Sequence, residues 1–213
     1  MKKTLLITLL LLCAATATSQ VYWNEERYFS INAGYAHSNI STGSFDLATL
    51  EITCYPSKPM GWEFSSEVRY GKDYLSIEPL GILGTLMTIY TQTHAGFDSD
   101  SKLLSVLLAI SSAKLPIYPL DVVEFTPYWS LLKLGKVYDS KFNVCGHVGI
   151  KAKIFPFVYS NNDDLHTLFI APFIQHDFGW QLKEGSVIPF YPGFNKESPF
   201  RGTSYGFQIG IYL

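Results

Sequence analysis

Apolar and polar residues alternate along this chain, and the alternation is clearest over its last ten residues. One face of residues 204–213 carries large apolar groups, namely Tyr205, Phe207, Ile209, Ile211 and Leu213. The other face carries small or polar groups, namely Ser204, Gly206, Gln208, Gly210 and Tyr212. A strict period of two with one apolar face is typical of a half-buried β-strand.

The same alternation recurs through the chain and predicts about eight strands. The segments that carry it are residues 28–37, 45–55, 62–70, 75–92, 122–134, 142–154, 165–182 and 204–213. Stretches rich in Gly, Pro, Ser and Asn separate most of these segments, as is typical of turns. The chain is therefore predicted to be all-β and antiparallel.

Charged residues gather on one face of two segments. The predicted polar cluster consists of Glu63, Glu67, Arg69, His147, Lys151 and Lys153. The opposite faces carry Trp62, Phe64, Val68, Phe142, Val148 and Ile150. A soluble sandwich would turn the charged face to water, whereas a barrel in lipid would turn it into the lumen, where charges pair. In a lumen, the cluster is either a structural salt-bridge plug or a pathway for a charged ligand.

Two segments allow a helix as well as a strand. The apolar run at 75–92 contains Gly81 and Gly84, and Pro79 fits the first position of a helix. Residues 122–134 also have a plausible helix start and stop. We predict strands for both. Leucines at helical spacing over residues 103–110 predict a short helical insert in a connection.

Composition points away from an ordinary soluble domain. Charged residues make up 16% of the chain, against roughly 25% in soluble domains. The net charge is -2 and no Lys/Arg block occurs, so nucleic acid is not an expected partner. No metal-ligand spacing occurs, so we expect no metal and no other cofactor.

The first residues predict export. A basic start (Met1, Lys2, Lys3) precedes a short apolar run and then small residues, which is typical of a cleaved secretory signal. We assign residues 1–19 to this signal peptide and residues 20–213 to a single domain. Aromatic residues near the predicted strand ends, Tyr70, Trp180 and Tyr212 among them, would form interfacial girdles in a membrane.

The terminal strand resembles the C-terminal signal of bacterial outer-membrane β-barrels. That signal reads polar, any, Gly, any, any, apolar, any, apolar, and Ser204, Gly206, Ile209 and Ile211 fit it in register. Such barrels usually end on an aromatic residue, whereas this chain ends on Leu213.

The resemblance implies a closed, antiparallel, up-and-down transmembrane β-barrel of about eight strands with a short helical insert. It places the protein in the outer membrane of a Gram-negative bacterium. We then expect outer-membrane lipid to be its partner, with Phe207, Ile209 and Ile211 facing that lipid.

The expected role is structural, adhesive or partner-binding through the outward loops, with another envelope protein as a candidate partner. Two alternatives stay open: an enzyme that modifies lipid or lipopolysaccharide, and a soluble lipocalin-like carrier of an apolar ligand. The catalytic candidates are His37 and Ser38, which offer a base and a nucleophile. Adjacent residues on a strand point to opposite faces, so we predict no catalytic centre there.

Overall fold

The computed structural model describes residues 29–54, 63–84, 86, 112–120, 123–156, 168–180, 194–195 and 198–212. The predicted signal peptide and the predicted helix at residues 103–110 lie outside these ranges. Among the described residues, no helix is both long and apolar enough to cross a membrane.

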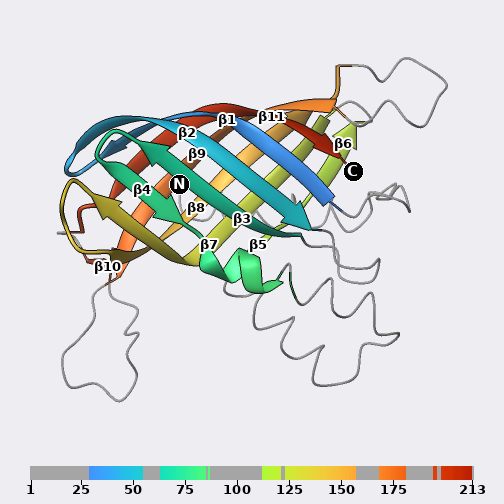
Figure 1. The fold of residues 1–213 in the computed structure, drawn as a ribbon. Coiled ribbons are helices and arrows are strands. Elements are labelled where there is room, and N and C mark those ends of the chain that lie inside the picture. The colour runs from blue at the N-terminus through green and yellow to red at the C-terminus, as the bar shows by residue number, and fades with distance from the viewer. Residues whose placement is uncertain are drawn as a thin grey trace, which may run out of the picture.

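Eight strands of the described residues form a closed antiparallel ring (Figure 1). They are β1 (Phe29–Ile40), β2 (Gly43–Cys54), β3 (Phe64–Gly71), β4 (Tyr74–Ile77), β7 (Val123–Val137), β8 (Asn143–Ile154), β9 (Leu168–Trp180) and β11 (Gly202–Tyr212). Each strand pairs with the next, and β11 pairs with β1 to close the ring. The predicted up-and-down barrel is therefore confirmed, and 123–137 is a strand rather than a helix.

The fourth position of the wall, between β3 and β7, is built from two separate segments. β4 pairs with residues 134–137 of β7, and β5 (Ser112–Lys114) pairs with residues 128–130 of the same strand. A bridge between Glu63 and Lys114 joins β5 to the start of β3. Two further short strands, β6 (Ile117–Leu120) and β10 (Phe194–Asn195), pair antiparallel with β7 and β9 respectively.

A short helix follows β4, so the prediction of a strand across residues 75–92 was wrong for residues 79–84, and residues 87–92 of that prediction lie outside the described ranges. Residues 79–84 and 86 are helical. The helix packs against β3 through two glycines. A Cβ on Gly81 would lie 1.5 Å from the carbonyl oxygen of Ser65, and one on Gly84 would lie 2.5 Å from the ring of Phe64. Only glycine permits this close approach.

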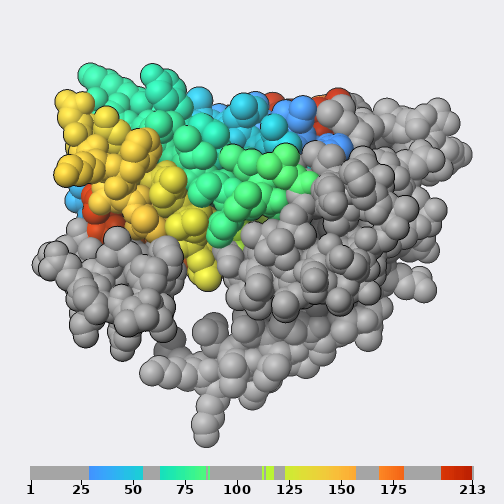
Figure 2. Space-filling view, turned by 60° about the horizontal axis from the view of Figure 1, so that its bottom comes forward, coloured from blue at the N-terminus to red at the C-terminus, as the bar shows by residue number. Residues whose placement is uncertain are grey.

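The helix lies on the outer surface of the wall, beside β3 and β4 (Figure 2). It explains why Phe64 is buried although it stands on the outward face of β3. The outward side chains of the helix are apolar and exposed, with Ile82 at 45% and Leu83 at 51%.

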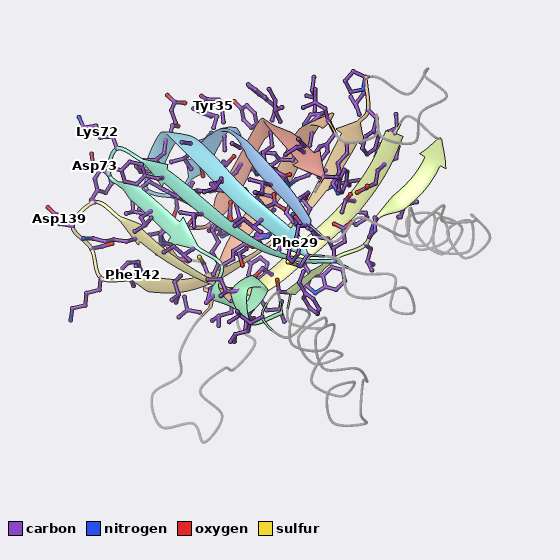
Figure 3. All side chains as sticks on the ribbon, turned by 45° about the vertical axis from the view of Figure 1, so that its right-hand side comes forward. Phe29, Tyr35, Lys72, Asp73, Asp139 and Phe142 are labelled. Carbon is purple, nitrogen blue, oxygen red and sulfur yellow. The ribbon has the colours of Figure 1, made fainter. Side chains whose placement is uncertain are left out.

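The two ends of the barrel differ. The turns after β1, β3 and β7 lie at one end, where Lys72, Asp73 and Asp139 are found, and Phe29 lies at the other (Figure 3). We call these the hairpin end and the N-terminal end. Inside the hairpin end is an apolar plug of Ala36, Ile40, Phe45, Leu47, Tyr74, Val137, Cys145, Phe173 and Phe200. Inside the N-terminal end is a smaller one of Phe155, Phe169, Ala171 and Tyr212.

Candidate functional site: a charged lumen and an outward polar cluster

Between the two plugs, the lumen is filled with buried charged side chains. Six are carboxylates: Glu51, Glu63, Glu67, Glu78, Glu124 and Asp177. Five are cations, Arg69, Lys114, Lys133, Lys151 and Lys153, and His147 is buried beside them. Because the two signs nearly balance, these groups can pair with each other and offset the cost of removing charge from water.

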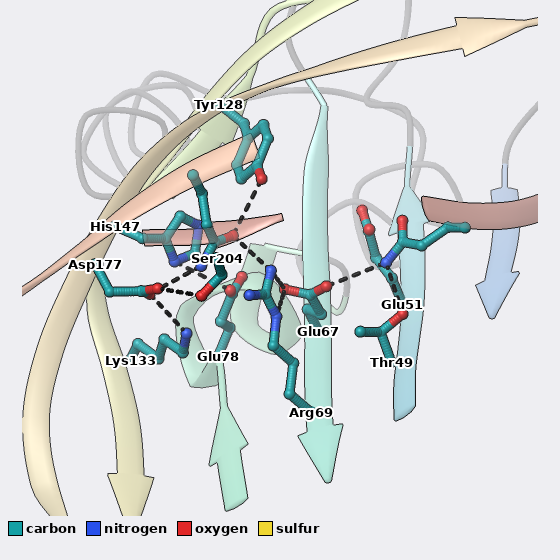
Figure 4. Close-up of polar contacts among 12 residues, drawn as sticks. Thr49, Glu51, Glu67, Arg69, Glu78, Tyr128, Lys133, His147, Asp177 and Ser204 are labelled. Carbon is teal, nitrogen blue, oxygen red and sulfur yellow. Dashed lines mark hydrogen bonds and ion pairs between the residues drawn. The ribbon is translucent and has the colours of Figure 1, made fainter. Parts of the chain in front are cut away.

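Lys133 and Asp177 form the centre of one subnetwork, near the hairpin end (Figure 4). The Lys133 Nζ donates to Asp177 Oδ1 at 3.0 Å. The Ser204 hydroxyl donates to the other oxygen of Asp177 at 2.8 Å, and Gln175 Nε2 donates to Oδ1 at 2.8 Å. The carboxylate is therefore held by one cation and two neutral donors.

Arg69 lies in the middle of the lumen. Its Nε and Nη2 both contact Glu67 Oε2, at 2.9 and 2.7 Å. Its Nη2 also donates to Gln175 Oε1, and its guanidinium lies 5.1 Å from the centroid of the Phe173 ring. A guanidinium with these partners and an aromatic face beside it is fixed in one orientation.

Glu51 on β2 lies between two lysines from other strands. Lys151 on β8 and Lys114 on β5 both form ion pairs with it. Lys151 also donates to Gln208 Oε1 at 2.6 Å, and Gln208 in turn donates to Glu67 Oε1 at 3.1 Å. These contacts connect five strands of the wall across the lumen, namely β2, β3, β5, β8 and β11.

Near the N-terminal end, Lys153 is paired with Glu124 at 2.7 Å and lies 3.6 Å from Glu63 Oε2. The Tyr212 hydroxyl accepts from Lys153 Nζ at 2.9 Å and donates to Glu124 at 3.1 Å. The prediction that Tyr212 belongs to an interfacial girdle was wrong, because its ring points inward and is buried. Tyr70, by contrast, points outward and is 67% exposed.

The six residues predicted as a polar cluster all lie inside the barrel. β3 carries Glu67 and Arg69, and Glu63 immediately precedes that strand. β8 carries His147, Lys151 and Lys153. His147 Nδ1 lies 3.3 Å from Glu78 Oε1.

Six further charged groups were not predicted: Glu51, Glu78, Lys114, Glu124, Lys133 and Asp177. The alternation already places Glu51 and Glu124 on the face opposite apolar residues, so it could have indicated that both belong to the charged lumen. Lys133 could not be found in this way, because a register shift between Ser130 and Lys133 moves the inward positions of β7 from even to odd numbers.

The outward faces of the described strands are mainly apolar. Phe207, Ile209 and Ile211 are 48%, 51% and 43% exposed. Within the described strands, the charged side chains on the outward face are Asp46 and Lys136, both close to the hairpin end.

A polar cluster on this outward face joins three neighbouring strands. The Tyr35 hydroxyl donates to Asp46 Oδ1, and His37 Nδ1 lies 2.9 Å from the same oxygen. The His37 ring lies 5.4 Å from the ring of Tyr205 on β11. We call Tyr35, His37, Asp46 and Tyr205 the outward polar cluster.

His37 and Ser38, the catalytic candidates, point to opposite sides of the wall. Ser38 is fully buried, and its hydroxyl is 2.8 Å from that of Ser204 in the lumen. His37 belongs to the outward polar cluster. Among the described residues, no group of three or more His, Cys, Asp and Glu side chains is placed to hold a metal ion.

Comparison with known proteins finds a likeness among solved structures. No family model matches the chain, and no curated protein matches it. The crystal structure of neisserial surface protein A (NspA) is similar over 87% of this chain and 96% of that chain, with 9% sequence identity and a TM-score of 0.43.

Proposed function

We propose that this protein is a small outer-membrane barrel of a Gram-negative bacterium, exported through a cleaved signal peptide. In this proposal it is a closed, rigid structural element, and its hairpin end serves adhesive or partner-binding contacts. Outer-membrane lipid surrounds its wall, and another envelope protein is the candidate partner at the hairpin end.

The observation that carries the proposal is the inverted polarity of the barrel. Charged groups fill the inside, whereas large apolar side chains cover the outside, including Ile31, Leu50, Ile52, Val148, Ile150, Ile154, Ile170, Ile174 and Ile209. Soluble monomers rarely expose contiguous apolar patches larger than a few hundred Å². An apolar band around a closed barrel fits the hydrocarbon of a bilayer, where every backbone group must be paired within the protein.

The contents of the lumen favour a structural role over transport. The plug at the hairpin end includes Phe200, whose ring is 5.8 Å from that of Tyr74. An eight-stranded barrel is just wide enough for its interior to be filled by side chains. The charged middle layer also disfavours the alternative of a lipocalin-like carrier, because an apolar ligand would have to displace paired charges.

The hairpin end is held together by contacts between neighbouring turns. The Ser41 amide donates to the Arg201 carbonyl at 2.9 Å, and the Ser41 hydroxyl donates to the Ser198 carbonyl at 2.6 Å. The Tyr138 amide donates to the Asp73 carbonyl at 2.7 Å. A surface that is already ordered loses little conformational entropy on binding, which supports a role in contacts with a partner.

The enzyme alternative lacks a comparable observation. His37 and Ser38 lie on opposite sides of the wall, so they do not form a base and nucleophile pair.

The test is location and orientation in intact cells. We expect the protein to fractionate with outer membranes and to migrate differently on gels before and after heating. A cysteine at Thr42, exposed in a hairpin turn, should react with a membrane-impermeant maleimide on whole cells. The matched control is a cysteine at Pro156, exposed at the N-terminal end, which should react only after lysis. Recovery in a detergent-free soluble fraction, or the reverse labelling pattern, would contradict the proposal.

A further inference from the structure

We propose that the helix after β4 is immersed in the hydrocarbon of the bilayer, where its outward side chains contact lipid acyl chains and its backbone closes an interruption in the barrel wall. The inference rests on the proposed membrane location. It assigns to the membrane interior an element outside the strands, which a closed barrel does not by itself require.

The wall is interrupted on one side of β3. The Glu78 amide donates to the Glu67 carbonyl at 3.1 Å, and Glu63 exchanges two backbone hydrogen bonds with β5 at 2.8 and 3.0 Å. Because the backbone groups of alternate strand residues point to the same side, the Ser65 carbonyl faces the space between these two contacts. Gly81 of the helix occupies that space and lies against the Ser65 carbonyl oxygen. The helix therefore stands where a strand of the wall is missing.

The outer side of the helix is apolar. All described helical residues, 79–84 and 86, are Pro, Leu, Ile or Gly. Ile82, Leu83 and Leu86 are 45%, 51% and 58% exposed. Pro79, at the first helical position, lacks the N–H group that hydrocarbon would leave unpaired. A helix that is hydrophobic all round belongs in a protein core or in a membrane. Since this helix lies on the outer surface, the membrane is the environment that it fits.

The depth of the helix follows from its contacts with β3. Tyr70, near the hairpin turn of this strand, points outward and is 67% exposed, as expected of a residue in an interfacial girdle. Ser65 and Phe64, which contact Gly81 and Gly84, are five and six residues further from the turn. With about 3.3 Å per residue and a strand tilt of about 40°, they lie about 13–15 Å below Tyr70. An apolar band about 25 Å tall places that depth close to the midplane.

The position of the helix has a physical reason. At this depth β3 carries Ser66 on its outward face, and the Ser65 carbonyl faces the interruption. Polar groups that meet hydrocarbon without a partner are costly. The helix lies against the backbone of both serines, and the Ser66 hydroxyl is buried. Ile82 and Leu83 are presented to the lipid in their place.

The experiment is electron paramagnetic resonance of single nitroxide labels on the folded protein in phospholipid vesicles. The labels are placed at Leu83→Cys on the helix, Ile209→Cys on the wall and Lys72→Cys in an exposed hairpin turn. The native Cys54 and Cys145 are buried, so labelling of the folded protein leaves them unmodified. Power saturation compares the collisions of each label with oxygen, which concentrates in hydrocarbon, and with a water-soluble nickel chelate.

We expect the oxygen-to-nickel collision ratio at Leu83 to match that at Ile209 and to exceed that at Lys72. A ratio at Leu83 as low as that at Lys72, together with a high ratio at Ile209, would overturn the immersed helix and leave the membrane location standing. A Leu83 label that collides little with either reagent would be covered by protein, which would also overturn the contact with lipid. Low ratios at all three positions would instead overturn the membrane location, so the two failures are distinguishable.

Discussion

A lysine placed at Ile209 tests whether the outward face of β11 meets hydrocarbon. Ile209 stands in one row with Ala33 and Ile170, and it is half-exposed on the outer surface. If Tyr205 marks the interface, Ile209 is four residues deeper along the strand. With about 3.3 Å per residue and a strand tilt of about 40°, this corresponds to a depth of about 10 Å. An apolar band about 25 Å tall places that depth close to the midplane.

The cost of Ile209→Lys should therefore be about 2–4 kcal/mol. The matched control is Thr203→Lys on the same strand and the same face, two residues beyond Tyr205 towards the turns, where the cost should be about 0–1 kcal/mol. The inward neighbour Gln208 is unsuitable as a control, because it is buried and bonded to Lys151 and Glu67.

The assay is a reversible unfolding titration with guanidinium in lipid vesicles, followed by tryptophan fluorescence and by the heat-dependent shift on gels. A difference of about 2–3 kcal/mol between the two variants corresponds to a change of roughly 30- to 150-fold in the folding equilibrium. Equal stability of Ile209→Lys and Thr203→Lys would mean that depth has no effect. The reasoning that puts this face in lipid would then be refuted.

Three further outcomes follow from the same structure. Lys133→Met should destabilise the barrel by about 3–5 kcal/mol, because it leaves the buried Asp177 without the lysine that is paired with it. The control Lys141→Met, at an exposed position, should change the unfolding free energy little. Similar losses of unfolding free energy in the two variants would contradict the pairing of Lys133 with Asp177. Gly81→Val should lower the unfolding free energy by about 1–3 kcal/mol or prevent folding, since its Cβ would overlap the Ser65 carbonyl oxygen. An unchanged unfolding free energy in this variant would show that the helix does not pack against β3 at Gly81. Purified protein in planar bilayers should show no porin-like conductance, because side chains fill both ends of the lumen; steady ohmic channels would disprove the plugged interior.

The local alternation of side chains was enough to predict most of the barrel. Period two identifies a strand and also separates its two faces, because successive side chains on a strand point in opposite directions. For that reason Glu67 and Arg69 on β3, and Lys151 and Lys153 on β8, could be placed on one side before any pairing was known. The terminal strand β11 was predicted for the same reason, whereas the closed ring was expected from the resemblance of that strand to the C-terminal signal of outer-membrane barrels.

Three features of the barrel depend on tertiary contacts and could not be predicted from the alternation of side chains within one segment. The run after β4 is apolar enough for either a strand or a helix, and the fit of Gly81 against Ser65 accompanies the helix. The three-residue strand β5 is too short to show a period, yet it completes the wall between β3 and β7. One register shift in β7 turns Lys133 inward to Asp177.

The sequence also could not predict which charged side chains in the lumen pair with each other. Lys151 and Glu51 are 100 residues apart along the chain, and their ion pair exists only because β8 and β2 face each other across the lumen. The outward polar cluster likewise depends on the register that brings His37 level with Asp46 and Tyr205. Alternation is fixed by each strand alone, whereas pairing across a barrel is fixed by the closure of all the strands together.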